Sequence, residues 1–458
     1  MLIANGTVVT EDRVERCDVR IEGGVITELG QGLTPHDPAE TLIDASDRLV
    51  TPGGVDVHTH MDLLVGTLRA TDSFLTGTRA AACGGTTTII DHMAFGPEGC
   101  GLQYQVDVYH ALAEGNAVVD YGFHGVVDRV DDAILAEMEQ LVREGITSFK
   151  FYLTYDRRLD DEAAIRLLDR ARQLGALVCV HCENHAMLTW LRERFVAEGR
   201  LAPRYHPLSR PPACEAEAVF RVLSLAHVAQ DAPVYIVHTS SSAALDAAAA
   251  VPPQRNAFFE TCPQYLVLDD SRYELPGDEG LKYLMSPPLR KPADQEALWA
   301  ALLDGRIGVV ATDHCPFNFG GEKQLGKDDF TACPSGVPGV ELRMPLMYSE
   351  GVVKRGMDLT RFVQLCCTEP ARRFGVFPQK GTLAVGSDGD VLIFDPTKRV
   401  TVTHSMLHEN VDYTPYEGME LYGYPEITIS RGEVIARDGA FVGAPGRGRY
   451  LKRAILSS

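Results

Sequence analysis

The stretch SFKFYLTYDRRLDDEAAIRLLDRARQLGALVCVH, residues 148–181, contains two apolar runs separated by an amphipathic segment. The runs 148–153 and 176–181 have the length of strands, whereas residues 160–175 repeat apolar side chains at helical spacing and end in glycine. A strand, a helix and a second strand in this order are typical of a βαβ unit with two parallel strands. The fold is therefore expected to be α/β, and the same alternation continues on both sides of this stretch.

Eight strand-length apolar runs alternate with amphipathic segments through the middle of the chain. They are residues 55–60, 86–92, 118–125, 148–153, 176–181, 233–238, 256–261 and 307–314. Eight strand–helix repeats over about 300 residues predict a (β/α)8 barrel of the TIM type. A doubly wound sheet is the alternative, but no GxGxxG phosphate turn follows the first strand.

The two ends of the chain have a different pattern. Residues 1–50 and 380–458 contain short alternating runs separated by glycine-containing turn signals, which are typical of β-hairpins. Neither end is long enough to form a good sandwich alone. We therefore expect one small β-sandwich domain from residues 1–50 plus 380–458, beside a barrel domain of residues 51–379.

Composition and charge limit the classes of partner. The 458 residues carry a formal net charge of −20, which argues against nucleic acid or an anionic membrane surface as a partner. No apolar run approaches the roughly 18 residues that a membrane span requires. The N-terminal sequence MLIANGTVVTEDRVE shows no secretory signal, so we expect a cytoplasmic protein with a small-molecule substrate.

Eleven cysteines are scattered along the chain, and we expect all of them to be reduced and structural. Cys179 and Cys182 have CxxC spacing around His181, which is also found in redox motifs and zinc knuckles. No second CxxC completes a four-cysteine site.

Reactive side chains stand at the carboxyl ends of the predicted strands, where barrel enzymes place their active sites. His58 and His60 end the first run, and their i, i+2 spacing puts both imidazoles on one face of a strand. His181, His238 and Asp313 occupy the corresponding position in later runs. Four imidazoles and a carboxylate suit a divalent metal such as zinc and exceed the needs of one ion with an open site. The pattern therefore predicts two metal ions.

A simpler interpretation exists for each histidine alone, since a histidine at a strand end is more often a hydrogen-bonded core residue than a ligand. The five residues together favour the metal site. His92 and His124 also end apolar runs, but no ligand is needed from them. We expect these two to lie behind the ligands or to be structural.

Lys150 lies in the apolar run 148–153, between Phe149 and Phe151. A charged lysine there would be disfavoured by burial and by neighbouring metal ions, so its pKa should fall. The alternative is a lysine whose side chain extends to the rim. A neutral amine can react with carbon dioxide to form a carbamate that could bridge two metals, and the residues alone permit this without requiring it.

Five motifs together resemble the cyclic-amidohydrolase branch of the amidohydrolase superfamily and, within it, the dihydropyrimidinase/hydantoinase group: HTH (58–60), SFKFYLTY (148–155), VHCEN (180–184), IVHTSS (236–241) and ATDHCPF (311–317). Further stretches fit the same group: GGTTTIIDH (84–92), SRPPACEAEA (209–218), ETCPQYL (260–266), SPPLR (286–290) and FPQKGTLAVGSDGDVLIFDP (377–396). FHG (123–125) and the C-terminal GRGRYLKR favour members like bacterial D-phenylhydantoinase. The resemblance spans essentially the whole chain.

The resemblance implies a binuclear metal centre, with zinc the expected metal. The ligands of the more buried ion would be His58, His60 and Asp313, and those of the more exposed ion His181 and His238. Lys150, as N6-carboxylysine, would bridge the two ions together with a water or hydroxide.

The resemblance also implies catalytic and substrate-binding roles. Two metals would lower the pKa of the shared water, and Asp313 would take its proton and later protonate the leaving nitrogen of the ring amide. Tyr155 would donate a hydrogen bond to the oxyanion. The backbone of Ser286 would hold the substrate amide, and Ser335 stands where relatives commonly have asparagine and use the backbone.

The group's pocket for the ring substituent is formed by loops after the first and fourth strands. Here these loops supply the apolar and aromatic residues Met61, Leu63, Leu64, Tyr152 and Leu159. The expected reaction is therefore the opening of 5-substituted hydantoins, of the D-phenylhydantoin type, or of dihydropyrimidines to N-carbamoyl amino acids.

Three alternatives fit the same resemblance less well. A dihydroorotase would be expected to carry an arginine shortly after HTH, where this chain has Met61 and Asp62. An allantoinase would place the polar ureido group of its substrate against the apolar pocket residues named above. A non-catalytic scaffold protein of the same fold would lack much of the ligand set that this chain retains. Members of the group are commonly homotetramers, so a homotetramer is expected.

Overall fold

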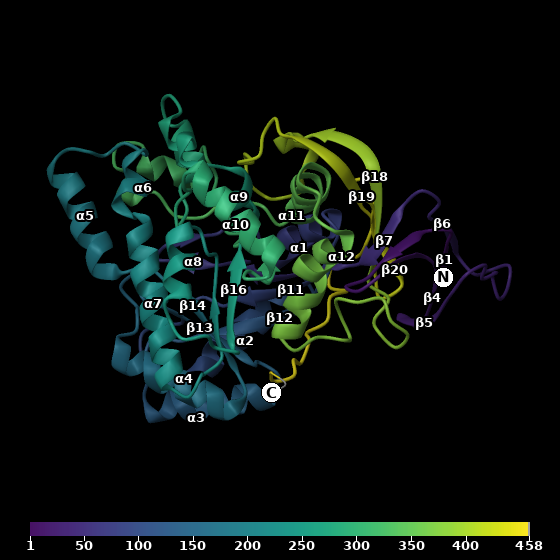
Figure 1. Ribbon diagram of the computed structural model, residues 1–458, viewed down its shortest axis with the longest axis horizontal. Coiled ribbons are helices and arrows are strands. Elements are labelled where there is room, and N and C mark those ends of the chain that lie inside the picture. Colours follow the sequence, from purple (N-terminus) through teal and green to yellow (C-terminus); the bar gives the residue numbers. More distant parts are fainter. Residues whose placement is uncertain (457–458) are drawn as a thin grey trace.

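Eight parallel strands form the centre of the larger part of the molecule in the computed structural model, which describes residues 1–456 (Figure 1). Along the sheet they are β17 (Val309–Val310), β16 (Ala257–Thr261), β15 (Val234–Ile236), β14 (Leu177–His181), β13 (Ser148–Tyr152), β12 (Asp120–Val126), β11 (Thr86–His92) and β8 (Gly54–Thr59). A parallel bridge between Thr59 and His314 brings the two edges of the sheet together. The predicted (β/α)8 barrel is confirmed.

Helices follow most of these strands and cover the outside of the barrel (Figure 1). The longer ones are α1 (Phe74–Cys83), α2 (Leu102–Ala113), α3 (Asp132–Arg143), α4 (Asp161–Leu174), α5 (His185–Ala197), α7 (Pro212–Val228), α8 (Ser242–Ala249) and α10 (Pro292–Asp304). Shorter helices are α6 (Tyr205–Ser209), α9 (Pro263–Val267), α11 (Arg343–Leu346), α12 (Leu359–Val363) and α13 (Glu369–Arg373). None of the described helices is long and apolar enough to cross a membrane.

The βαβ unit of residues 148–181 illustrates how the sequence produces the barrel. Helix α4 begins where the Asp160 side chain accepts a hydrogen bond from the Ala163 amide, and it ends at Gly175 with φ of 68°. Leu167 and Leu168 lie on its buried face. In β13 the side chains alternate, so Phe149 and Phe151 pack in the same cluster as those leucines, between the barrel and its helices. Lys150 therefore points into the barrel.

Two predicted strands are shorter than expected. The runs 233–238 and 307–314 form strands only at Val234–Ile236 and Val309–Val310. His238 and Asp313 have φ of 41° and 53°, which lie outside the extended region. The backbone therefore leaves each strand just before the residue that carries the predicted ligand.

Strands from both ends of the chain share one seven-stranded sheet. Its order is β21 (Ala440–Phe441), β20 (Glu433–Arg437), β19 (Glu420–Ser430), β18 (Val391–Thr401), β7 (Leu49–Pro52), β2 (Thr7–Val9) and β3 (Val14–Arg16). A four-stranded sheet contains β5 (Val25–Gly30), β4 (Asp18–Glu22), β1 (Leu2–Ala4) and β6 (Leu42–Asp44). A short hairpin of β9 (Leu64–Val65) and β10 (Leu68–Arg69) follows β8.

One apolar cluster joins these two larger sheets. Ile3 and Val19 from the four-stranded sheet pack in it with Val391 and Ile429 from the seven-stranded sheet. The end of the chain then returns to the barrel, since the Leu451 amide donates to the carbonyl of Tyr121. The domain limits 1–50 plus 380–458 and 51–379 remain a proposal.

Candidate metal centre

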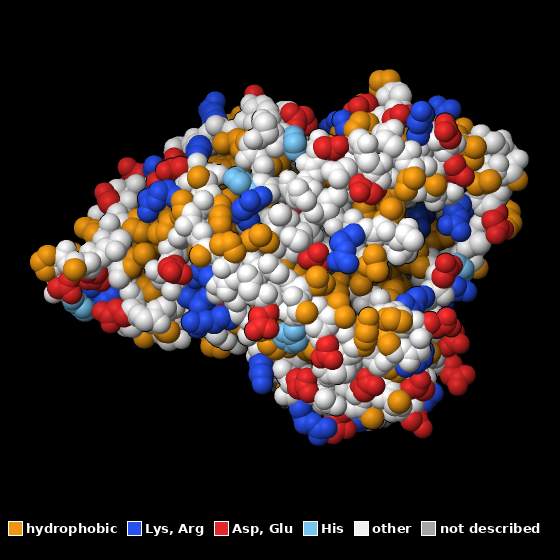
Figure 2. Space-filling model, turned by 180° about the vertical axis from the view of Figure 1, so that it is seen from behind, with side chains coloured by type: hydrophobic (Ala, Val, Ile, Leu, Met, Phe, Trp, Pro, Cys, Tyr) orange, Lys and Arg blue, Asp and Glu red, His pale blue; other side chains and the backbone are white. Residues whose placement is uncertain are grey.

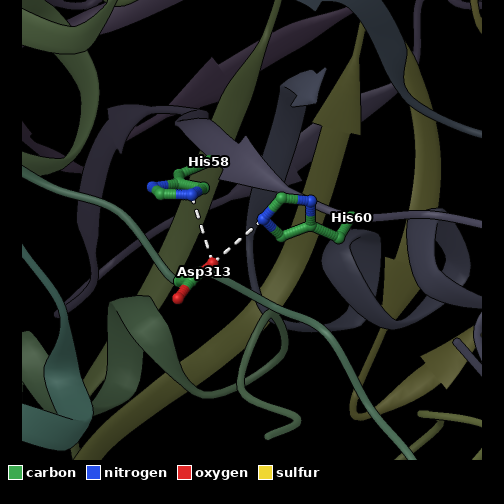
Figure 3. A group of neighbouring side chains, drawn as sticks. All are labelled: His58, His60 and Asp313. Atoms are coloured by element: carbon green, nitrogen blue, oxygen red, sulfur yellow. Dashed lines mark hydrogen bonds and ion pairs between the residues drawn. The ribbon is translucent and has the colours of Figure 1, made fainter. Parts of the chain in front are cut away.

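His58, His60 and Asp313 come together at the carboxyl end of the barrel (Figure 3). The Nε2 atoms of His58 and His60 each lie 3.1 Å from the same carboxylate oxygen, Oδ1 of Asp313. His58 lies on β8, His60 directly follows this strand, and Asp313 follows β17, so closure of the barrel brings them together. Two imidazole nitrogens around one carboxylate oxygen form a ligand set that suits a divalent metal.

The proton on His58 is directed away from this group. Its Nδ1 lies 2.6 Å from Oε1 of the buried Glu260, which can only accept, so Nδ1 donates. In the neutral ring, Nε2 then presents a lone pair toward Asp313, and among the described residues Nε2 has no hydrogen-bond partner. Burial opposes protonation of His58, but Glu260 and Asp313 on either side raise its pKa to about 9, so the ring is protonated near pH 7 unless a cation takes the place of the proton on Nε2. This surplus of negative charge fits a bound cation.

His181 and His238 form a second pair of imidazoles. The Nδ1 of His181 lies 2.9 Å from Nε2 of His238, and the Nε2 of His181 donates to Glu183 over 2.7 Å. Burial lowers the pKa of both imidazoles, so both rings are neutral near pH 7. Glu183 holds His181 so that its Nδ1 faces His238, an arrangement that orients imidazoles as metal ligands.

Lys150 lies inside the barrel, near both pairs. Its side chain is buried, and its charge would lower the pKa of all four imidazoles. Burial lowers the pKa of Lys150 itself, although Asp313 opposes this effect. Within residues 1–456 its Nζ forms no ion pair, and it lies 5.3 Å from the centre of the Tyr152 ring. These surroundings favour a neutral amine.

The two remaining strand-end histidines lie directly beneath the ligand candidates. His92 and His124 stack with ring centres 4.0 Å apart, and His92 lies edge-on to His58 at 4.4 Å. His124 bonds the Ser148 hydroxyl and the carbonyl of Val57. Burial lowers the pKa of both rings, so they support the site as neutral groups.

Three of the predicted site residues have left-handed backbone conformations. Tyr155, His238 and Asp313 have φ of 72°, 41° and 53°. Such conformations cost a non-glycine residue roughly 1–3 kcal/mol, and in this chain they also occur away from the site, at Asn5 and Asp47 for example. At the three site residues the turn follows a barrel strand and directs the side chain across the rim.

Tyr155 lies beside the metal centre, and Ser286 and Ser335 lie next to each other. The Tyr155 ring lies 5.3 Å from the His181 ring, and the guanidinium of Arg210 lies 5.6 Å from the Tyr155 ring. The Ser286 hydroxyl donates to Oγ of Ser335 over 3.1 Å, so these two residues, 49 positions apart, are neighbours.

The five predicted pocket residues are not all at the rim. Tyr152 lies beside the Tyr155 ring at 5.8 Å, and Leu63 and Leu64 belong to the segment around β9, where Leu64 is exposed. Met61 is fully buried, with its sulfur against Gly77 of α1. Leu159 is also buried, and it lines an open pocket of about 560 Å³ with Arg158 and His185.

Three residues of the site were missed by sequence reasoning. Glu260 accepts hydrogen bonds from His58, from the Tyr235 hydroxyl and from the His238 amide. Glu183 accepts from His181 and from Arg210. Glu260 lies near the end of the run 256–261, so the strand-end rule could have found it, whereas no local pattern indicates Arg210.

One cysteine, Cys83, lies with Glu341 and His408 in a second group of side chains that could hold a metal ion. All eleven cysteines are free in residues 1–456, and Cys179 and Cys182 are both buried. Burial raises the pKa of the Cys179 thiol to about 12, which leaves it protonated near pH 7.

Comparisons with known proteins agree with this geometry. Residues 49–435 match the Amidohydrolase family. The chain is 50% identical over 454 residues to a D-phenylhydantoinase of Escherichia coli O1:K1 / APEC, covering 99% of this chain and 98% of that protein. The structure of dihydropyrimidinase from Brevibacillus agri NCHU1002 is 45% identical with a TM-score of 0.97, covering 100% and 99% of the two chains. D-hydantoinase from a Bacillus sp. AR9, described with evidence for mercury inhibition, is 44% identical with a TM-score of 0.96 over 100% of both chains.

Proposed function

This chain belongs to the amidohydrolase family, and from that premise we propose that it opens 5-substituted hydantoins, of the D-phenylhydantoin type, or dihydropyrimidines to N-carbamoyl amino acids. It is thus a hydrolase of cyclic amide C–N bonds. The observation that carries the proposal is the convergence of four imidazoles, Asp313 and Lys150 in a chain that matches hydantoinases from end to end.

Amidohydrolases are generally binuclear metal enzymes, and the residues at the rim fit such a centre. His58, His60 and Asp313 would hold one ion, and His181 and His238 the other. When bound, two divalent ions, for which zinc is our proposal, supply a water of lowered pKa as the nucleophile.

Lys150 is proposed to bridge the two ions as N6-carboxylysine. Its burial and the neighbouring imidazoles favour the neutral amine. That amine would form an N–C bond to carbon dioxide and lose one proton. The resulting carbamate has two oxygens and a negative charge, which matches two cations on either side.

Asp313 is the proposed proton carrier. The imidazoles of His58 and His60 overcome the effect of burial and hold the pKa of Asp313 well below its usual range, so its carboxylate is ionised and able to accept a proton. Its second oxygen, Oδ2, would take the proton of the attacking water. The same carboxyl would then give it to the ring nitrogen as the C–N bond breaks, so one group acts as base and acid.

Tyr155 and the serine pair are proposed to hold the substrate. Although the Tyr155 side chain is partly exposed, desolvation raises the pKa of its hydroxyl, which is therefore protonated and able to donate to the developing oxyanion. The backbones at Ser286 and Ser335 would bind the ring amide. Tyr152 and Leu64 are the residues best placed to contact the ring substituent. Met61 is fully buried, so it would pack behind these pocket residues and not against the substrate.

A substrate panel tests the proposal. Purified enzyme of known metal content is assayed with D-phenylhydantoin, L-phenylhydantoin, dihydrouracil and allantoin. We expect ring opening of the phenylhydantoin or dihydrouracil substrates and two divalent ions per chain. Preference for allantoin would refute the hydantoinase assignment, and a metal-free protein that opens none of these rings would refute the enzyme itself.

Partners beyond the small cyclic substrate are part of the same proposal. Figure 2 shows acidic and basic side chains interspersed over one face of the molecule, in keeping with the net charge of −20 and with a partner that is not nucleic acid. We expect a homotetramer, which sedimentation analysis would test. Trp190 on α5 and Val228 at the end of α7 are exposed and available to such an interface.

A further inference from the structure

Lys323 is a fully buried lysine that the chemistry described above does not use. It lies on a short 3₁₀ helix, Glu322–Gly326, after the last barrel strand. Its Nζ donates to the carbonyl oxygen of Leu284 over 2.7 Å and to that of Pro334 over 2.9 Å. One ammonium group therefore joins two loops that are 50 positions apart along the chain.

No carboxylate balances the charge of Lys323 within residues 1–456. The other buried lysine outside the metal centre, Lys380, pairs with Asp120, Asp388 and Asp390 at 2.6–2.9 Å. Lys323 has only carbonyl oxygens, and burial lowers its pKa. Because a buried and unpaired ammonium is costly, a purely structural bridge would be better made by an uncharged residue.

The two carbonyls that Lys323 holds belong to the loops of the proposed substrate-binding serines. The carbonyl of Pro334 lies in the same peptide group as the N–H of Ser335. Leu284 precedes Ser286 by two residues, and its carbonyl also accepts from the Gly336 amide over 3.0 Å. The hydroxyls of the two serines are 3.1 Å apart. The lysine thus fixes the spacing of both loops at the point where they meet.

A second buried donor acts on the adjacent peptide group. Nε2 of His206 lies 2.7 Å from the carbonyl oxygen of Met285, and this carbonyl shares a peptide group with the N–H of Ser286. The oxygen can only accept, so the imidazole donates. Both serine peptides are therefore hydrogen-bonded on their carbonyl side by a buried donor, which orients them and strengthens their N–H groups as donors.

We propose that Lys323 is a positioning residue for substrate recognition, holding the Leu284 and Pro334 carbonyls so that the backbones of Ser286 and Ser335 bind the ring amide. This inference rests on the proposed function. It predicts an effect on substrate binding more than on bond breaking, because Lys323 contacts neither the metal ligands nor Tyr155.

Lys323→Met tests this inference, since methionine fills a similar space without donating. With D-phenylhydantoin or dihydrouracil we expect KM to rise about tenfold, which corresponds to about 1.4 kcal/mol of binding, while kcat changes less than threefold. Metal content should equal that of the wild type. Lys327→Met is the matched control, because Lys327 is an exposed lysine at the end of the same turn, and its KM should not change.

Measuring KM and kcat separately distinguishes a positioning role of Lys323 from an effect on folding. A merely structural lysine would reduce the fraction of active enzyme, and so kcat, while leaving KM unchanged. If Lys323→Met yields no folded holoenzyme, Lys323→Arg carries the test, because its larger, planar guanidinium changes the geometry of the donors to the Leu284 and Pro334 carbonyls and should also raise KM. An unchanged KM in every folded, metal-loaded Lys323 variant would overturn the inference. A wild-type enzyme that opens none of the rings would instead refute the proposed function.

Discussion

Replacing Glu260 by glutamine should weaken metal binding, because this one carboxylate supports both imidazole pairs. Its Oε1 accepts from Nδ1 of His58 over 2.6 Å and from the backbone amide of His238 over 3.0 Å. Its Oε2 accepts from the Tyr235 hydroxyl over 2.9 Å. Glutamine has the same shape, and its amide oxygen can still accept the first two bonds, so the protein should fold.

The expected magnitude follows from the charge that is lost. A hydrogen bond to a charged group contributes about 1.5–3 kcal/mol and a neutral one about 1 kcal/mol, so each bond to a ligand residue weakens by about 1 kcal/mol. Two such bonds amount to about 2 kcal/mol, or about a 30-fold loss of metal affinity. This value lies within the roughly 10–100-fold range for partners that orient metal ligands.

The assay is a chelator titration. Wild-type and Glu260→Gln enzymes are equilibrated with increasing chelator, and bound metal and ring-opening activity are measured on the same samples. Metal and activity should be lost together, at about 30-fold less free chelator in the variant. Tyr235→Phe is the control, because it removes one bond from the same carboxylate without touching a ligand, and it should shift the midpoint less than threefold. The reasoning would be refuted if Glu260→Gln kept its metal as well as the wild type does. It would also be refuted if Tyr235→Phe lost its metal as readily as Glu260→Gln.

Three further variants test other parts of the structure. Lys150→Ala should lose metal and activity together, with partial rescue by an added short-chain carboxylate, and full activity without rescue would contradict the bridging role. Tyr155→Phe should keep its metal but lower kcat about 100-fold, since one oxyanion donor is removed; an unchanged kcat would exclude the tyrosine from that role. Lys380→Met should reduce the free energy of unfolding by about 3–5 kcal/mol in a denaturant titration, because it removes the shared cation from the buried Asp120 and Asp390 and the partly buried Asp388. If Lys380→Met unfolds at the same denaturant concentration as the wild type, the cluster of Lys380 and its aspartates does not contribute to stability.

The sequence alone was sufficient to predict the barrel and the proposed ligand positions. Apolar runs of strand length and helical repeats are local patterns, because each reflects how one segment buries its own face. The residue types of His58, His60 and Lys150 are read directly from the sequence, whereas the structure shows that Phe149 and Phe151 pack outside the barrel while Lys150 points into it. Strands from both ends of the chain do share one sheet, as expected from their similar turn patterns.

Only the tertiary structure decided which groups support these ligands. Glu260 bonds His58, which is 202 positions away in the sequence. Lys323 joins the loops of Leu284 and Pro334, and the sequence of neither loop indicates this contact. The strands before His238 and Asp313 end earlier than predicted, at Ile236 and Val310, and both residues have positive φ. Met61 is buried although it follows an active-site motif. Such contacts arise when the barrel closes and brings distant strand ends to one rim. A local pattern records whether a side chain is buried, whereas the partner that it meets depends on how all eight strands are arranged.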